Sequence, residues 1–220
     1  MTIADIFDRY LDQRPPGRGP RPGAHTPLER LPMVALDCET TGLDSRRDRI
    51  VSIALVPIHA GLVVAARPVL DLLIDPQMPI PPAATRIHRL DDAAVAGAPT
   101  IAGAWASIVS TMRDTVVIGH HVGFDIAMLA REAQRTGCSW REPPHLDTAA
   151  LAVGLGLAHE SLDLADMLVR LGVKTCGERH TAGGDATMAA ELFVTVAQRL
   201  RGQGRATFAG AVAAQRLPRQ

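Results

Sequence analysis

The order of apolar segments along the chain constrains its fold more than any other sequence feature. Residues 33–39 and 50–58 are apolar runs typical of buried strands, and residues 62–66 and 69–74 suggest a third strand bent at Pro68. A short strand at 116–118 and helical patterns follow at 100–112, 123–135, 147–155, 162–171 and 184–200. Three strands followed by alternating strands and helices predict an α/β fold with a mixed sheet.

The two ends of the chain differ from this middle part. Residues 2–13 have the spacing of a short amphipathic helix, and residues 14–32 hold six prolines and three glycines. We therefore expect an N-terminal helix and Pro/Gly-rich arm over 1–32, a compact domain over 33–201 and a basic tail or helix over 202–220. Residues 206–217 are suited to a helix that packs either on the domain or on a partner.

The charges balance in sum but not along the chain. The sequence has 23 basic and 23 acidic residues, which argues against a broad basic nucleic-acid surface. Residues 33–191 carry 13 basic and 19 acidic side chains, net −6, whereas residues 192–220 carry five arginines and no acid. The acidic middle is either a solvated surface or a group of carboxylates gathered around a metal.

Cysteine usage and hydropathy indicate the compartment. The three cysteines form no C-x-x-C pair, so we expect neither a disulfide framework nor a structural zinc site. The first residues lack the apolar region of a signal peptide, and no apolar run is long enough to span a membrane. We expect a cytoplasmic protein with no membrane contact.

The first candidate site is the pair Asp37 and Glu39 at the end of the first strand. Alternate residues of a strand share a face, so both carboxylates point the same way and Cys38 points to the opposite side. Neighbouring carboxylates repel, and a divalent cation is the simplest compensation. A solvent-exposed strand end explains this pair alone equally well.

Two further motifs begin predicted helices. His120, His121, Phe124 and Asp125 lie where a short strand leads into a helix, a place where open α/β sheets often hold their sites. His180 and Asp185 lie where the last long helix begins. An acid in a first helical turn is also favoured by the helix dipole, so each motif by itself fits a purely structural role.

Together the motifs predict a metal site. Asp37, Glu39, Asp125 and Asp185 all lie at element ends that can meet at one edge of a sheet. Four carboxylates suit two Mg²⁺ or Mn²⁺ ions, which prefer oxygen ligands and promote phosphoryl transfer. A histidine such as His180 suits deprotonation of an attacking water.

The ordered motifs resemble those of the DnaQ-like 3′–5′ exonucleases of the DEDDh group, which include proofreading enzymes such as the epsilon subunit of DNA polymerase III. The resemblance covers about residues 33–200 and implies a ribonuclease H-like fold, with a five-stranded mixed sheet flanked by helices. It implies two Mg²⁺ or Mn²⁺ ions held by the four carboxylates, with His180 as general base. Residues carried over as substrate contacts are Thr40, Thr41, Leu43, His88, His121 and Phe124.

For two further positions, the sequence fits a structural role as well as a role in substrate binding. His88 lies in a segment similar to the family's I-H-x-[IL], but a histidine that caps a loop also fits it. Asp147 matches a family D-T pair, and we interpret it as a helix cap. The family usually has Asn where this chain has His121, so substrate contact and pH response are expected to differ there.

The predicted function is removal of nucleoside 5′-monophosphates from 3′ ends of single-stranded or frayed DNA. An RNA 3′–5′ exonuclease similar to RNase T or oligoribonuclease is the first alternative, because nothing in the sequence reads a 2′-hydroxyl. A non-catalytic module that binds nucleic acid or a polymerase is the second. The predicted partner is a nucleic-acid 3′ end, and either arm offers a contact for a polymerase or another protein.

Overall fold

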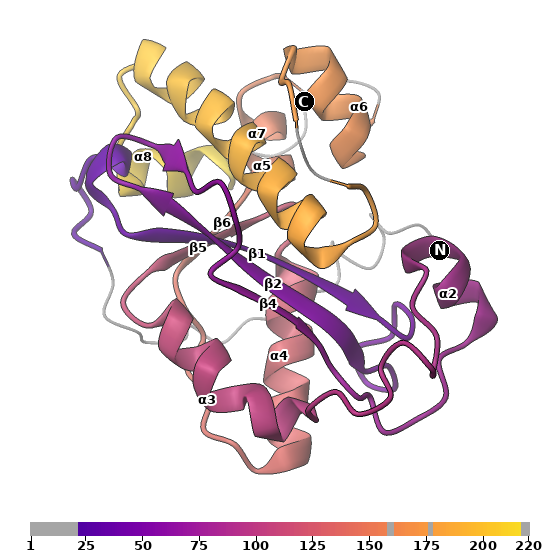
Figure 1. Cartoon of the computed structure of the whole chain (residues 1–220). Helices are drawn as coiled ribbons and strands as arrows, with labels where there is room; N and C mark the ends of the chain where they lie inside the picture. The colour runs from indigo at the N-terminus through magenta and orange to yellow at the C-terminus, as the bar shows by residue number, and fades with distance from the viewer. Residues whose placement is uncertain (1–21, 158–160, 176–177, 217–220) are drawn as a thin grey trace.

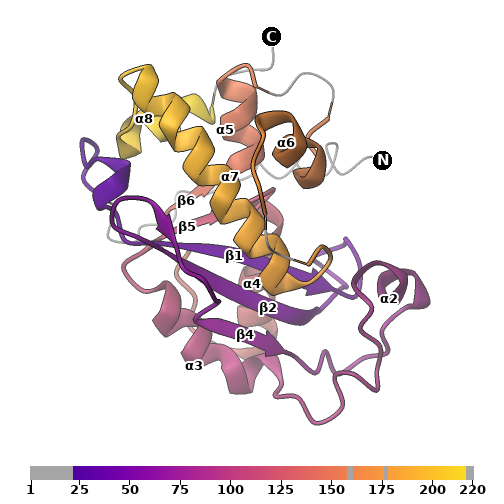
Figure 2. The same ribbon diagram turned by 45° about the horizontal axis from the view of Figure 1, so that its top comes forward.

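The computed structural model describes residues 22–157, 161–175 and 178–216, so the helix expected at 2–13 lies outside the described residues. A mixed sheet runs through the centre of the molecule with helices on both faces (Figures 1 and 2). The strands are β1 (Met33–Thr40), β2 (Ile50–His59), β3 (Val63–Val64), β4 (Leu70–Leu73), β5 (Val116–Gly119) and β6 (His145–Asp147). The predicted α/β class with a mixed sheet is confirmed.

Strand pairing brings three strand ends to one edge. The order is β3-β2-β1-β5-β6; β1 is antiparallel to β2 and parallel to β5, and β5 is parallel to β6. The carboxyl ends of β1, β5 and β6 therefore face the same way. The third predicted strand is divided, since β3 and β4 pair separately with β2, and the sheet has six strands where the resemblance implies five. Pro68 lies in the break.

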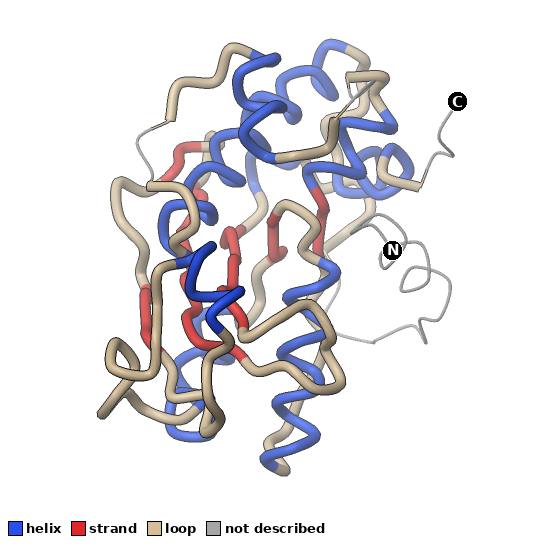
Figure 3. The backbone as a smooth tube through the Cα atoms, turned by 90° about the vertical axis from the view of Figure 1, so that its right-hand side faces the viewer, coloured by secondary structure: helices blue, strands red, loops and turns tan. Residues whose placement is uncertain are grey.

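Helices lie on both faces of the sheet (Figure 3). They are η1 (Leu28–Arg30, a 3₁₀ turn), α2 (Pro82–His88), α3 (Ile101–Met112), α4 (Gly123–Thr136), α5 (Thr148–Gly154), α6 (Leu164–Leu171), α7 (Ala182–Gly202) and α8 (Phe208–Ala214). The predicted cap of α3 is confirmed, because the Thr100 hydroxyl accepts a hydrogen bond from Gly103 N. Helix α2, which packs in a separate small core with Val51 of β2, was not predicted.

Residues of β1 alternate between the two layers. Val34, Leu36 and Cys38 pack in the core beneath α3 and α4. Met33 and Ala35 pack in the other core, under α5, α6, α7 and α8. Because the strand period is two, Asp37 and Glu39 continue the row that faces α7. Cys38 thus points into the core, as predicted.

The C-terminal helix packs on the domain itself. Residues of α8 are buried against α5 and α7, and the backbone N of Ala209 donates a hydrogen bond to Ala24 O at 2.9 Å. A Cβ atom on Gly154 of α5 would lie 1.9 Å from Ala214 O, so only glycine allows the two helices to approach this closely. No helix in the described part of the chain is long and apolar enough to span a membrane.

Candidate active site

Strand β1 delivers the first two carboxylates. Asp37 pairs with Ala54 of β2 and Glu39 with Ser52, and the register shifts directly after Glu39. The irregularity ends regular pairing at the point where the two acidic side chains emerge on the α7 side of the sheet. The sequence and the register together therefore place both carboxylates at one strand end.

Helix α4 delivers the third carboxylate. Asp125 lies in the first turn of α4, is 5% exposed, and its Oδ1 accepts a hydrogen bond from the backbone N of Cys38 at 3.1 Å. This bond fixes the start of α4 against β1. Gly119, at the end of β5, lies close to the backbone of β1, because a Cβ atom there would lie 2.9 Å from Leu36 O.

Helix α7 delivers the fourth carboxylate together with the candidate base. Thr181 caps α7 by accepting a hydrogen bond from Gly184 N, and Asp185 Oδ2 accepts one from His180 N at 3.2 Å. His180 has a φ of 61°, which turns the loop back onto the helix. Gly184 permits this fold-back, since a Cβ atom would lie 1.9 Å from Glu178 O.

These elements bring the carboxylates together. One oxygen of each of Asp37, Glu39 and Asp185 lies within 4.8 Å of the other two. Asp125 is close enough to raise the pKa of Asp37 through its charge. Three of the four acids singled out in the sequence thus form one cluster between β1 and α7, and Asp125 of α4 lies beside it.

The cluster is electrostatically unfavourable without a cation. Burial, followed by the charges of Asp125, Glu39 and Asp185, raises the pKa of Asp37 well above its ordinary value. Burial and the charge of Asp185 raise the pKa of Glu39 to about 7. Burial also raises the pKa values of Asp125 and Asp185. Carboxylates packed this way need either protons or metal ions.

The donor set fits a hard divalent cation. Every candidate ligand is a carboxylate oxygen, the type that Mg²⁺ and Mn²⁺ prefer. Asp185 Oδ1 is buried and makes no hydrogen bond within the described structure, although Arg179 Nε faces it at 3.3 Å as an ion pair. Buried polar atoms without a partner are rare in folded proteins.

Comparisons with known proteins agree with this geometry. The RNase T family model, described as an exonuclease, matches residues 34–193. The chain belongs to this exonuclease family. It is 39% identical over 191 residues to a DNA polymerase III subunit epsilon-like protein of Rhodobacter capsulatus, covering 86% of this chain and 27% of the relative. It is 28% identical over 172 residues to DNA polymerase III subunit epsilon of Treponema pallidum, covering 76% and 77%.

Solved structures show the fold of this exonuclease domain. Exonuclease X in complex with 5′ overhanging duplex DNA superposes with a TM-score of 0.62 at 22% identity, covering 83% of this chain and 99% of that one. E. coli exonuclease I in complex with a dT13 oligonucleotide gives 0.67 at 18% identity, covering 80% and 43%. The fold is ribonuclease H-like. The chain spans about a quarter to a third of the length of the first curated relatives it matches.

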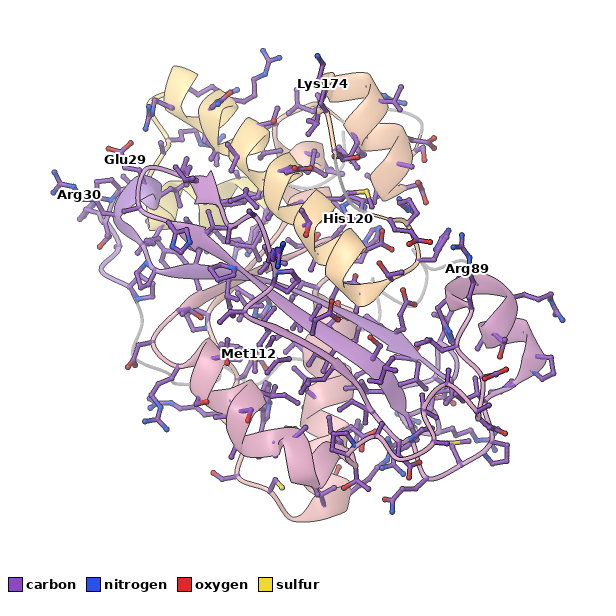
Figure 4. The ribbon with its side chains drawn as sticks, in the orientation of Figure 1. Glu29, Arg30, Arg89, Met112, His120 and Lys174 are labelled. Atoms are coloured by element: carbon purple, nitrogen blue, oxygen red, sulfur yellow. The ribbon has the colours of Figure 1, made fainter. Side chains whose placement is uncertain are left out.

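The two histidines of the second motif have separate structural roles. His120 Nε2 donates to Leu162 O at 2.6 Å and Nδ1 lies 2.9 Å from the Thr148 hydroxyl, while burial lowers the pKa of His120 to about 4. His120 is therefore a neutral residue that connects β5 to α5 and α6. Figure 4 shows it on the α7 side of the sheet.

His121 occupies a position with a special backbone. Its φ is 59°, in the left-handed region where Asn, Asp and His are several-fold enriched among non-glycine residues. Its backbone N donates to Asp147 Oδ1 at 3.2 Å. This backbone conformation is one that both His and Asn adopt more readily than most residues.

The threonines after the strand are held by their own loop. The Thr40 hydroxyl donates to Gly42 O at 2.7 Å. The Thr41 hydroxyl donates to Asp48 Oδ1 at 2.9 Å and accepts a hydrogen bond from Arg49 N. Both threonines are buried, so their hydroxyl groups shape the loop after β1.

The other candidate substrate contacts differ in how deeply they are buried. Leu43 is 54% exposed on the loop after β1, whereas Phe124 packs partly on the core under α4. His88 is buried at the end of α2, and its Nδ1 accepts a hydrogen bond from Leu90 N at 3.1 Å. Burial lowers the pKa of His88, partly offset by the backbone oxygen of Thr40, which places α2 beside the strand end.

The predicted role of Asp147 as a helix cap is confirmed. Asp147 caps α5 by accepting hydrogen bonds from Ala149 N and Ala150 N. Arg179, whose Nε lies 3.3 Å from Asp185 Oδ1, was not predicted from the sequence. Its position next to His180 was the one available signal, and that signal does not reveal where the side chain points.

Proposed function

We propose that this domain is a metal-dependent 3′–5′ exonuclease of the DEDDh type that acts on single-stranded or frayed DNA. The observation that carries the proposal is the cluster of three carboxylates from β1 and α7, with Asp125 of α4 beside it, in a chain of the exonuclease family. The backbone N of His180 donates to the carboxylate of Asp185. The epsilon-like relatives and the DNA-bound structural neighbours support DNA as the substrate.

Each acidic side chain has a defined part in this proposal. Asp37, Glu39, Asp125 and Asp185 would hold two divalent cations, Mg²⁺ or Mn²⁺. Such ions, when bound, neutralise charge on the scissile phosphate and on the leaving 3′-oxygen. The fixed bonds of Asp125 to β1 and of Asp185 to His180 N keep the ligands in place before substrate arrives.

His180 accepts the proton in this proposal. Its backbone is anchored through Asp185, while its side chain lies on the loop before α7 rather than within a helix. A loop position lets the imidazole approach a water next to the scissile phosphate, where it acts as general base. The protonated ring then carries the positive charge beside the developing phosphate product.

The proposed substrate contacts come from the end of β1 and the loop after it, the end of α2, the turn before α4 and the start of α4. Leu43 would pack against the terminal base, and Phe124 against the penultimate sugar or base. His88 and the Thr40–Thr41 backbone would lie near the terminal nucleotide, and His121 near the phosphate at the turn between β5 and α4. The exonuclease domain would span 33–201. A polymerase or another protein would contact the chain through 1–32 or through the exposed residues of 202–220, since Phe208, Ala211 and Ala214 of α8 are buried against the domain.

A digestion ladder tests this function. The purified chain is incubated with 3′-labelled and 5′-labelled single-stranded DNA, duplex DNA and RNA, in Mg²⁺, Mn²⁺ or EDTA. We expect stepwise shortening from the 3′ end of single-stranded DNA with release of 5′-monophosphates, and no reaction in EDTA. Faster digestion of RNA identifies the alternative substrate, and shortening from the 5′ end contradicts the proposal.

A matched pair of variants ties the activity to the site. Asp185→Ala should abolish Mg²⁺-dependent digestion, whereas Asp166→Ala, an exposed acid in the first turn of α6, should leave it unchanged. Both variants are compared by circular dichroism to establish that they fold. Digestion by Asp185→Ala at the wild-type rate would show that the site assignment is wrong.

A further inference from the structure

A guanidinium group lies where the carboxylate cluster needs positive charge. Arg179 immediately precedes His180, and its side chain is 29% exposed. Its Nε lies 3.3 Å from Asp185 Oδ1, and its Nη1 lies 3.9 Å from Asp163 Oδ1. Arg179 therefore stands between a candidate metal ligand and a second acid outside the cluster.

The contact between Arg179 and Asp185 is an ion pair without a hydrogen bond. Arg179 Nε and Nη1 and Asp185 Oδ1 are all buried, and none has a hydrogen-bond partner in the described structure. A permanent Arg–Asp bridge usually forms paired N–H···O bonds, and unpaired buried groups are costly. The incomplete geometry is that of a cation that neutralises the site without being fixed to it.

The charge of Arg179 acts on several members of the cluster. It lowers the pKa values of Asp37, Glu39 and Asp185, opposing the increases caused by burial and by the neighbouring acids. One positive charge cannot balance four carboxylates, but it reduces their repulsion while no metal is bound.

Asp163 offers Arg179 a second position. Asp163 caps α6, its side chain is 55% exposed, and its Oδ1 already accepts a hydrogen bond from Ala165 N at 2.8 Å. The distance from Nη1 to this carboxylate is 3.9 Å, so a small rotation of the Arg179 side chain can move the guanidinium from the cluster toward solvent. The negative charge of Asp163 keeps the group close to the site.

We propose that Arg179 is an internal counter-cation: it stabilises the carboxylate cluster in the metal-free protein and withdraws toward Asp163 when divalent metal binds. The inference rests on the proposed metal site and adds to it a residue that competes with the metal. Two cations that compete for the same carboxylates are linked reciprocally, so removing one must tighten the binding of the other.

Thermal unfolding of the full chain, in EDTA and over a MgCl₂ titration, tests the proposal without measuring activity. Arg179→Gln removes the charge and Arg179→Lys keeps it. Arg201→Gln is the matched control, because Arg201 belongs to α7 and pairs with Glu29 far from the cluster. We expect Arg179→Gln to unfold at least about 3 °C lower than wild type in EDTA.

The Mg²⁺ response supplies the decisive comparison. The half-saturating Mg²⁺ concentration should fall for Arg179→Gln by about 5-fold or more, the lower end for coupled sites. Arg179→Lys should lie between this variant and wild type, and Arg201→Gln should match wild type. If Arg179→Gln is unfolded in EDTA, refolding at Mg²⁺ concentrations below those that saturate wild type supports the proposal.

Failure of the proposed metal site and failure of the proposed competition give different results. A wild-type protein whose unfolding temperature does not respond to Mg²⁺ or Mn²⁺ overturns the metal site and the proposed function. A wild-type protein that responds, with Arg179→Gln binding Mg²⁺ equally or more weakly, overturns only the competition. In that case Arg179 positions Asp185 for the metal instead of opposing it.

Discussion

Two groups of buried charge lie along one helix, and they are balanced in opposite ways. Asp125, in the first turn of α4, belongs to the four-carboxylate cluster. Glu132, two turns further along α4, is completely buried but accepts hydrogen bonds from Arg49 Nε at 2.7 Å and Arg135 Nη1 at 3.2 Å. The chain's own arginines pair with the carboxylate of the second group, whereas the four carboxylates of the first have one arginine beside them, Arg179.

The self-neutralised group supports the other one. Arg49 lies just before β2, and Arg135 donates hydrogen bonds to Asp48 O and Ser45 O. Glu132 and its two arginines thus hold the loop after β1, which carries the exposed Leu43. The contrast teaches that a buried charged residue does not by itself mark a functional site. An excess of buried charge of one sign indicates such a site.

The largest effect should come from removing one of the crowded carboxylates. Asp37→Asn should lower exonuclease activity at least about 100-fold, since even groups that only support metal ligands contribute 10- to 100-fold. The same change removes repulsion, so the free energy of unfolding in EDTA should rise. Labelled-oligonucleotide digestion and urea denaturation measure the two effects. A variant that loses stability in EDTA contradicts the comparison.

Removing Glu132 from its two arginines should have the opposite effect on stability to removing Asp37. Glu132→Ala leaves Arg49 and Arg135 without their buried partner and should lower the free energy of unfolding by about 3–5 kcal/mol. The loss should be the same with and without Mg²⁺. The double variant Arg49→Met with Glu132→Leu is the control, because an apolar replacement of both partners should recover most of the stability. An equal loss in the double variant would argue against the ion pair.

The pH dependence of the metal-free protein should report the surplus charge. The pKa of Glu39 is raised from 4.5 to about 7, so the folded protein binds more protons than the unfolded chain in this window. The stabilising effect of the proton on Glu39 is complete below about pH 4.5 and is lost as pH rises through 7. The free energy of unfolding in EDTA should therefore fall from pH 5 to 7, by less than about 1.4 kcal/mol per unit for each such group. Saturating Mg²⁺ should reduce this slope.

The smallest effect on the fold should come from the exposed end of the supported loop. Leu43→Ala removes a side chain that is 54% exposed, so the free energy of unfolding should change by less than about 0.5 kcal/mol. KM for single-stranded DNA should rise roughly tenfold if a base packs against Leu43. Steady-state kinetics measures KM, and Val63→Ala, another exposed apolar residue, is the control. An unchanged KM shows that Leu43 does not contact substrate.

Most of the fold was predictable because its strands and longer helices have strong periodic patterns. Residues 33–39, 50–58 and 123–135 lie almost on the observed β1, β2 and α4. Helix α2 was missed since it is seven residues long, begins at Pro82 after Pro81, and has no side-chain cap. Strand β6 is only three residues long, too short for a visible alternation.

The site was predictable to the extent that its chemistry is written in local motifs. Asp37, Glu39, Asp125 and Asp185 each lie at an element end, so their convergence followed from the order of the elements. Glu132 and its partner Arg49 are 83 positions apart, and no local pattern links them. The position of the Arg179 side chain was equally unpredictable, because it depends on the loop before α7, which packs closely against Gly184.

The placement of Cys38 has a consequence for oxidation chemistry. Its thiol lies between two candidate ligands in sequence, yet it points into the core with Val34 and Leu36 and is 9% exposed. Burial and the neighbouring Asp125 raise the pKa of Cys38 well above its ordinary value, so the reactive thiolate is scarce. Of the two cysteines in the described part of the chain, Cys138, which is half-buried, should react with iodoacetamide before Cys38 in the folded protein. The strand that carries the carboxylates is thereby shielded from peroxide and alkylating agents.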